Sequence, residues 1–103
     1  MRESQYQAGL IKRIEKRLPG CLIIKNDSAA RQGIPDLTIL WRWYWAQLEV
    51  KISEDADWQP NQDYYVRTLN DMSFAAFIYP ENEEAVLNDL QQEYENSRAT
   101  RLS

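Results

Sequence analysis

Apolar and polar residues recur along the chain with two different periods, and together they predict three helices and four strands. From Glu3 to Leu18 the apolar residues fall at helical spacing, lysine and arginine occupy the opposite side, and Pro19-Gly20 ends the helix. Four short apolar runs, the first of them β-branched, predict strands at 21–24, 36–41, 44–50 and 73–79. Two further helices are predicted at 61–70 and from residue 82 to about residue 96.

The order helix, strand, strand, strand, helix, strand, helix predicts an α/β fold of packed layers. Only Arg42-Trp43 separates the second and third strands, which predicts a hairpin although the glycine or asparagine of most tight turns is missing. The first strand is expected to be buried, and the helix at 61–70 is expected to face inward through Tyr65, Val66 and Leu69. Because no long linker divides the chain, we predict one domain over residues 1–96 and a frayed polar tail at 97–103.

Composition restricts the chemistry that this chain can perform. Its 103 residues, 44% of them hydrophobic and 27% charged, are enough for one globular domain. With no histidine and a single cysteine, Cys21, an intrachain disulfide, a structural zinc site and histidine-dependent catalysis are excluded. Catalysis would have to use carboxylates, lysine and hard metal ions. Neither a membrane span nor a signal peptide is predicted, and we expect a cytosolic location.

Charge is distributed unevenly along a chain whose net charge is −4. Residues 1–51 carry nine basic and five acidic side chains, a net charge of +4, whereas residues 52–103 carry three basic and eleven acidic ones, a net charge of −8. Such asymmetry is typical of a protein with one basic working surface and an acidic back. The alternative is that the acidic residues only solvate the two C-terminal helices.

Two carboxylates interrupt sequence that otherwise has the pattern of buried strands. A hairpin centred between Arg42 and Trp43 pairs residues whose numbers add to 85, which places Asp36 opposite Glu49. Their Cβ atoms would lie roughly 4.5–5.5 Å apart, with Lys51 on the same face of the strand as Glu49. Carboxylates this close repel unless a proton or a cation lies between them, and a hard ion such as Mg²⁺ accepts such a pair.

A third carboxylate, Glu3, lies on the apolar side of the first helix. At about 100° per residue, Glu3 falls at the centre of the apolar stripe and Glu15 at its edge. The helix N-terminus only partly explains an acidic residue aimed at the core side. We therefore expect Glu3 to bind a metal ion or water alongside Asp36 and Glu49, and Glu15 to be an ordinary boundary charge.

A purely structural explanation of the same residues is also open. Glu49 and Lys51 would then form a surface ion pair, and Glu3 would be a charge at a frayed helix end. The catalytic interpretation is favoured because the carboxylate pair falls in register on apolar strands and an inward-aimed acid precedes it.

The residues around this cluster resemble a known family. Gly33-Ile34-Pro35-Asp36 followed by Leu48-Glu49-Val50-Lys51 resembles the PD-(D/E)XK nuclease superfamily. Within it, Glu3-Ser4-Gln5-Tyr6-Gln7 and Gln59-Pro60-Asn61-Gln62 are similar to the compact VRR-NUC branch of phage and bacterial stand-alone nucleases. The resemblance extends from Glu3 to about Leu90 and implies a restriction-endonuclease-like α/β sandwich with a mixed sheet of about four strands. Two departures are Asp71-Met72, where a glycine is often found, and the aromatic run at 41–45.

The resemblance implies metal-dependent hydrolysis of phosphodiester bonds in DNA. Asp36, Glu49 and the backbone carbonyl of Val50 would bind Mg²⁺ or Mn²⁺, and Glu3 would bind it directly or through water. Lys51 would orient or deprotonate the attacking water, and Gln62 would hold the lysine or the substrate. A metal ion lowers the pKa of bound water, so an enzyme without histidine can still perform this hydrolysis. Six basic residues are candidates for contact with the DNA backbone, unless they only solvate the surface: Lys12, Arg13, Lys16, Arg17, Lys25 and Arg31.

These features predict a small homodimeric, structure-selective DNA endonuclease, with a Holliday junction resolvase as one candidate. Its expected location is the cytoplasm, that of the bacterial host cell if the chain is phage-encoded. The alternating indoles of Trp41, Trp43 and Trp45 are expected on one face, where they pack between subunits or stack on bases. The alternative is a catalytically inactive nuclease-fold protein that mimics nucleic acid or docks on another protein. The intact carboxylates and lysine count against this alternative, because a binding module has no need of opposed carboxylates.

Overall fold

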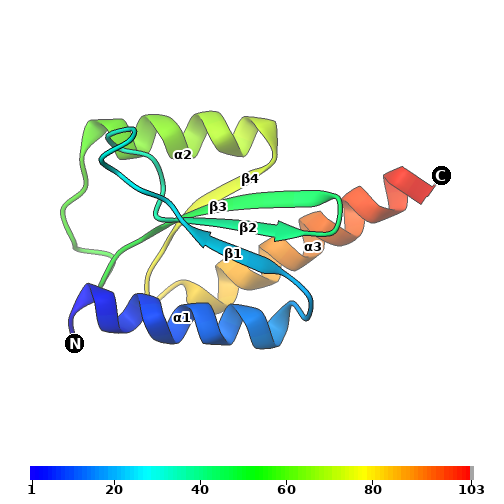
Figure 1. Ribbon diagram of the computed structural model, residues 1–103, viewed down its shortest axis with the longest axis horizontal. Helices are drawn as coiled ribbons and strands as arrows, with labels where there is room; N and C mark the ends of the chain where they lie inside the picture. The colour runs from blue at the N-terminus through cyan, green and yellow to red at the C-terminus, as the bar shows by residue number, and fades with distance from the viewer. Residues whose placement is uncertain (103) are drawn as a thin grey trace.

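Four strands form one mixed sheet with helices on both of its faces (Figure 1). The computed structural model describes residues 1–102. The predicted order of elements is confirmed, with these bounds: α1 (Glu3–Arg17), β1 (Leu22–Lys25), β2 (Leu37–Trp41), β3 (Tyr44–Val50), α2 (Pro60–Met72), β4 (Phe74–Ile78) and α3 (Glu83–Leu102). No helix within residues 1–102 is long and apolar enough to span a membrane.

The sheet has the strand order β1-β2-β3-β4. The pairs β1–β2 and β2–β3 are antiparallel, whereas β4 runs parallel to β3. A parallel neighbour requires a crossover connection, and α2 provides it on the face opposite α1 (Figure 1). The first turns of α1 and α2 consequently lie at the same end of the sheet (Figure 1).

The β2–β3 hairpin has the predicted register. Leu37 pairs with Leu48 and Trp41 with Tyr44, so Arg42 and Trp43 form a two-residue turn. Arg42 has a φ of 60°, and the turn therefore has its positive φ at the first central position, as in a type II′ turn. An arginine replaces the usual glycine there at a cost of about 1–2 kcal/mol.

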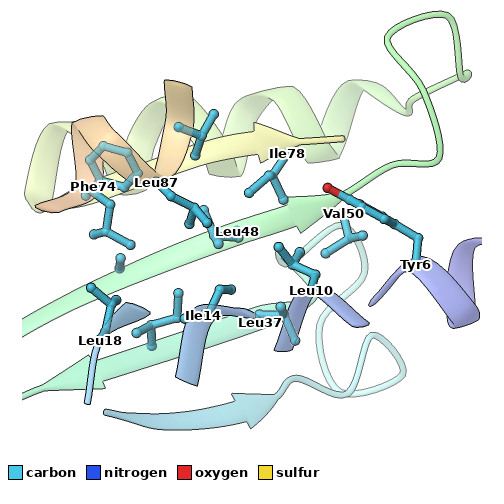
Figure 2. Close-up of a cluster of buried hydrophobic side chains, with 14 residues drawn as sticks. Tyr6, Leu10, Ile14, Leu18, Leu37, Leu48, Val50, Phe74, Ile78 and Leu87 are labelled. Carbon is cyan, nitrogen blue, oxygen red and sulfur yellow. The ribbon is translucent and has the colours of Figure 1, made fainter. Parts of the chain in front are cut away.

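The hydrophobic core lies between the sheet and the layer formed by α1 and α3. Leu10, Ile14 and Leu18 pack against Leu37 and Leu48, and all five side chains are fully buried (Figure 2). Because side chains alternate across a strand, the residues next to Leu37 and Leu48 point to the opposite face, beneath the start of α2. This alternation carries Asp36 and Glu49 out of the apolar core.

The first strand is not buried as predicted. β1 is an edge strand, and its Leu22 and Ile24 are 59% and 43% exposed because α2, on their side of the sheet, packs over β3 and β4 instead. Leu40 of β2, which pairs with Leu22, is 38% exposed on the same face. Only the alternate residues Cys21 and Ile23 pack partly against the core.

The predicted C-terminal tail is also different in the structure. α3 continues past Asn96 to Leu102 without a break, and residue 103 lies outside the described residues. The guanidinium of Arg101 lies 5.2 Å from the ring centroid of Trp43, so the last turns of the helix pack against the hairpin. The last helix is therefore longer than predicted, and the division into a domain at 1–96 and a tail at 97–103 stays a prediction.

The three indoles do not share one face. The turn at Arg42-Trp43 interrupts the strand alternation, so Trp41 and Trp43 stack on Tyr94 of α3, whereas Trp45 pairs with Leu40 on the other face of the sheet. The ring centroids of Trp41 and Tyr94 are 3.9 Å apart. The aromatic run is therefore packed within the chain, and the prediction of a single indole surface is wrong.

Candidate active site

The residues predicted to carry chemistry meet at the end of the sheet that faces away from the hairpin turn. Asp36 immediately precedes β2, Glu49 is the penultimate residue of β3, and Gln62 lies in the first turn of α2. The hairpin register, continued one position beyond Leu37–Leu48, places Asp36 opposite Glu49. The N-terminal ends of α1 and α2 lie at the same end of the sheet, where their dipoles favour negative charge (Figure 1).

Glu49 is an ionisable side chain in a buried position. It is 3% exposed; its Oε2 accepts a hydrogen bond of 2.9 Å from Gln62 Nε2 and lies 3.7 Å from Lys51 Nζ. Its Oε1 is buried and has no hydrogen-bond partner among the described residues. Burial, and next the neighbouring Asp36 carboxylate, raise the pKa of Glu49 to about 8, and Lys51 only partly opposes them. A buried oxygen left without a hydrogen-bond partner costs about 1–3 kcal/mol.

Lys51 is held in place by several acceptors. Its Nζ donates to Gln62 Oε1 at 2.9 Å and to the Asp57 carbonyl at 3.1 Å, and its side chain is 11% exposed. Its backbone N–H donates to the carbonyl of Ile78 at 2.9 Å, which continues the β3–β4 pairing by one residue. The ammonium group is therefore fixed beside the Glu49 carboxylate with little rotational freedom.

Gln62 connects the lysine, the carboxylate and the start of α2. Its Oε1 accepts the backbone N–H of Gln59 at 2.9 Å, which caps the helix, in addition to the Lys51 ammonium. Its Nε2 donates to Glu49. Because Gln62 lies in the first turn of α2, its amide oxygen points to Lys51 and its amide nitrogen to Glu49. One side chain therefore orients both charged groups.

Asp36 is oriented by the backbone of the opposite strand. Its Oδ2 accepts the Val50 N–H at 2.9 Å. Its carbonyl accepts the Asn26 N–H at 2.8 Å, and the Asn26 side chain bonds the Pro35 carbonyl, Gln47 and Thr38. Asn26 therefore holds the start of β2. The sequence gives no signal for this role, because Asn26 is one polar residue in a predicted loop.

Gly33 holds the loop that leads to Asp36 against the start of α2. Its φ is +90°, and a Cβ at this position would lie 2.4 Å from the Cβ of Asn61. Neither the conformation nor the spacing allows a side chain. The loop and the first turn of α2, which carries Gln62, are consequently packed together through this glycine.

Glu3 lies within electrostatic reach of the cluster. Its pKa is raised, first by burial and next by Asp36, and Lys51 opposes the shift. The side chain remains largely exposed at the start of α1. Among residues 1–102, no three acidic or thiol side chains are close enough to surround a metal ion. Glu3 thus lies near Asp36 and Glu49 without forming a three-carboxylate cluster with them.

The donor set nevertheless fits a hard divalent cation. The groups that converge are carboxylate oxygens, the ligands that Mg²⁺ and Mn²⁺ prefer. The unpartnered Oε1 of Glu49 is a buried oxygen with a free bonding position, and a cation there would relieve the repulsion that raises the pKa of Glu49. Asp36 and Glu49 are the residues that fit this role from their geometry.

The six basic residues predicted to contact DNA divide into two groups. Arg13 forms two hydrogen bonds with Glu83, at 2.7 and 2.9 Å, and Arg17 contacts Asn88, Gln91 and Glu84, so both link α1 to α3. Four others project from the surface: Lys12, Lys16, Lys25 and Arg31. Arg31 donates to the Tyr65 hydroxyl at 3.1 Å, and Lys25 pairs with Leu37, which places both near the Asp36 end of the sheet.

Comparison with known proteins identifies the fold. A solved structure described as a VRR_NUC domain superposes with a TM-score of 0.61 at 23% sequence identity, over 90% of each chain. No family model and no curated protein matches the chain. The chain therefore has a VRR-NUC-like fold, as its sequence motifs predict.

Proposed function

We propose that this protein is a metal-dependent DNA endonuclease and that Asp36, Glu49 and Lys51 form its active site. The observation that carries the proposal is the buried Glu49, whose Oε1 has no hydrogen-bond partner among the described residues. A chain selected only for stability gains nothing from a buried carboxylate facing a second carboxylate, and a cation that binds both explains it. The VRR-NUC-like fold supports a nuclease function in particular.

Each side chain has a role that follows from its contacts. Asp36 and Glu49 would hold Mg²⁺ or Mn²⁺, with the Val50 carbonyl and Glu3 as the further ligands that the resemblance implies. Such an ion supplies positive charge and lowers the pKa of water. Lys51 carries a fixed positive charge beside this pair and would orient water and offset the charge that develops on the phosphate. Gln62 keeps Lys51 in position, so it is a positioning residue.

The substrate is proposed to be DNA with branches or flaps, contacted through its backbone. Lys25 and Arg31 lie near the Asp36 end of the sheet, and Lys12 and Lys16 are exposed on α1. Contacts of this kind are independent of sequence and weaken as salt is added. Arg13 and Arg17 bind α3 and are expected to contribute mainly to the fold.

Paired cuts on a four-way junction require two active sites held in fixed relation, so we propose that the protein acts as a homodimer. Trp41 and Trp43 pack on their own α3, which leaves the exposed face of the edge strand as the surface for a second copy. Leu22, Ile24 and Leu40 are contiguous there, and the free edge of β1 can pair with the same strand of the partner.

Light scattering tests the dimer and should give a dimer mass for the wild type. Ile24→Glu should give a monomer, whereas Tyr64→Glu on α2 should stay dimeric.

Product mapping on a panel of DNA structures tests the function. Linear, single-stranded, flapped and four-way DNA are incubated with the protein in Mg²⁺ or Mn²⁺, and the cuts are located. The proposal predicts cleavage of the branched forms, with symmetric paired cuts if the enzyme resolves junctions. Binding without cleavage in either metal would instead favour the non-catalytic alternative.

A further inference from the structure

A cavity of about 250 Å³ opens beside the proposed active site, on the side of the loop that follows β3. Lys51 forms part of its wall, and its apolar surface comes from Ala56 and from the aromatic rings of Trp58, Phe77 and Tyr79. Pockets for drug-sized ligands are roughly 300–1,000 Å³, so this cavity suits something smaller. The volume is suited to one planar heterocycle.

Trp58 has the position expected of a stacking platform. Its indole is 52% exposed, and its ring centroid lies 5.3 Å from that of Phe77 with the two planes tilted by 56°. Phe77 thus supports the indole without covering it. A large exposed indole in a short loop contributes little to the fold, whereas it offers a π-face on which any base can stack.

The two carboxylates at the cavity favour a base over a phosphate on the side away from Lys51. Asp63 and Glu54 line it together with the aromatic rings, and carboxylates repel the DNA backbone. They also accept hydrogen bonds, as from the exocyclic amino groups of cytosine, adenine and guanine. Asp63 is held by Arg67, whose Nε lies 2.9 Å from its Oδ2. An aromatic platform bordered by acceptors is therefore complementary to an amino-bearing base.

We propose that this cavity binds one nucleobase of the cleaved strand, next to the phosphate that is hydrolysed, with Trp58 stacked on it. The inference rests on the proposed function, because Lys51 is the wall shared by the cavity and the active site. A phosphate beside Lys51 has its nearest bases within one nucleotide of that point. Trp58 would then position the scissile phosphate by holding the adjoining base.

The proposal is tested by combining a protein variant with a DNA lesion. After the cut has been mapped, the base on each side of the cleaved phosphate is replaced in turn by an abasic site. The wild type should lose about 5- to 150-fold in kcat/KM at one of the two positions, the range that stacking of one base supplies. Trp58→Ala should show the same loss on intact DNA and no further loss on the abasic substrate.

Two variants and a base series complete the design. Trp58→Phe retains an aromatic ring and should restore most of the rate, and Tyr64→Ala, which removes a 57% exposed ring outside the cavity, should have no effect. Thymine at the sensitive position should react more slowly than cytosine or adenine, because it has no exocyclic amino group. The proposal would be overturned if Trp58→Ala cleaved intact DNA at the wild-type rate. It would also be overturned if the losses in kcat/KM from the variant and from the abasic site multiplied when the two were combined.

A binding measurement separates this proposal from the proposed function. In EDTA, single-stranded DNA should quench indole fluorescence in the wild type, and the quenching should be smaller in Trp58→Phe and with an abasic strand. If the protein cleaves no DNA in either metal but shows this quenching, the nuclease function is wrong and the base site stands. If it cleaves DNA and the quenching is identical in both proteins, the base site is wrong and the nuclease function stands.

Discussion

The two ends of the β2–β3 hairpin contrast sharply, although one ladder of strand pairs joins them. At one end Asp36 faces Glu49, and the pKa of Glu49 is raised to about 8 by burial and by the second carboxylate. At the other end Trp41 and Trp43 stack on Tyr94 of α3. The carboxylate end is strained electrostatically, and the aromatic end is closely packed.

Each end contains one buried polar atom without a hydrogen-bond partner among residues 1–102. At the aromatic end it is the indole nitrogen of Trp43, a neutral donor, and at the carboxylate end it is Oε1 of Glu49. Nothing in the structure explains the indole nitrogen. Ionising Glu49 in this position is costly, because a charge loses more solvation on burial than a neutral group, and its raised pKa reflects that cost. Packing thus stabilises one end of the hairpin, whereas the other end leaves a buried carboxylate oxygen without a hydrogen-bond partner among the described residues.

Charge follows the same division. The basic side of α1 and the acidic start of α3 neutralise each other through Arg13 and Glu83, and the Tyr6 hydroxyl donates to the same glutamate at 2.8 Å. The strong segregation of charge along the sequence thus partly serves to join two helices.

Removing the ring at the centre of the aromatic end should have the largest effect on stability. Tyr94 is 4% exposed and contacts three aromatic residues of the hairpin, so Tyr94→Ala should lower the free energy of unfolding by about 3–5 kcal/mol. Cleavage per folded molecule should be unchanged. Urea denaturation measures the first effect, and Tyr64→Ala, which removes an exposed ring, should stay within about 0.5 kcal/mol of the wild type.

At the other end, Lys51→Ala should remove activity rather than the fold. If the ammonium offsets charge in the transition state, kcat should fall about 100- to 1,000-fold while metal binding by calorimetry persists. Arg98→Ala, which removes an exposed positive charge from α3, is the control and should keep kcat. A Lys51→Ala enzyme with the wild-type kcat would return Lys51 to the role of a structural ion-pair partner.

Gly20 and Gly33 have the same positive-φ backbone conformation but different surroundings, so alanine at each separates the effect of conformation from that of a steric clash. Gly20 has φ +87° and no atom within 4 Å of the place that a Cβ would occupy, whereas Gly33 has φ +90° and its Cβ would collide with Asn61. Gly20→Ala should cost about 1 kcal/mol of stability and no activity. Gly33→Ala should also displace the first turn of α2 and Gln62, and lower kcat by up to about 100-fold. Equal activity in both variants would show that Gly33 does not position Gln62.

The stability of the metal-free protein should depend on pH through Glu49. Between the ordinary pKa of 4.5 and the folded-state value of about 8, the folded protein holds a proton on Glu49 that the unfolded chain has lost. Stability of the metal-free protein should therefore fall as pH rises through this window. Glu49→Gln should flatten the curve in denaturation experiments in EDTA. An unchanged slope would mean that Glu49 is ionised throughout.

The sequence predicts much of this arrangement because its signals are local. Hydrophobic periodicity defines the elements, and a two-residue turn at Arg42-Trp43 fixes which residues of the hairpin face each other. Asp36 opposite Glu49 follows from that register. Strand alternation places Lys51 on the same face as Glu49, and the family resemblance implies that Gln62 lies near the lysine, where the structure has it.

Features that depend on distant contacts were not predictable. A four-residue apolar run has the same pattern in an edge strand as in a central one, so the exposure of Leu22 depends on where the helices pack. The last turns of α3 contact the hairpin through Arg101 and Trp43, and the role of Gly33 depends on Asn61. Each of these pairs is separated by more than twenty residues, beyond the reach of local patterns.

Metal-induced stabilisation is the measurement that tests the central claim, a divalent cation site at Asp36 and Glu49, most directly. Melting temperatures of the wild type and Asp36→Asn are compared with and without Mg²⁺ or Mn²⁺. Asparagine keeps an oxygen that can accept the Val50 N–H, so the metal-free variant should be at least as stable as the wild type. At a hundredfold excess over the dissociation constant, the ion should stabilise the wild type by about 2.7 kcal/mol and the variant far less. Equal shifts in the two proteins would contradict the account.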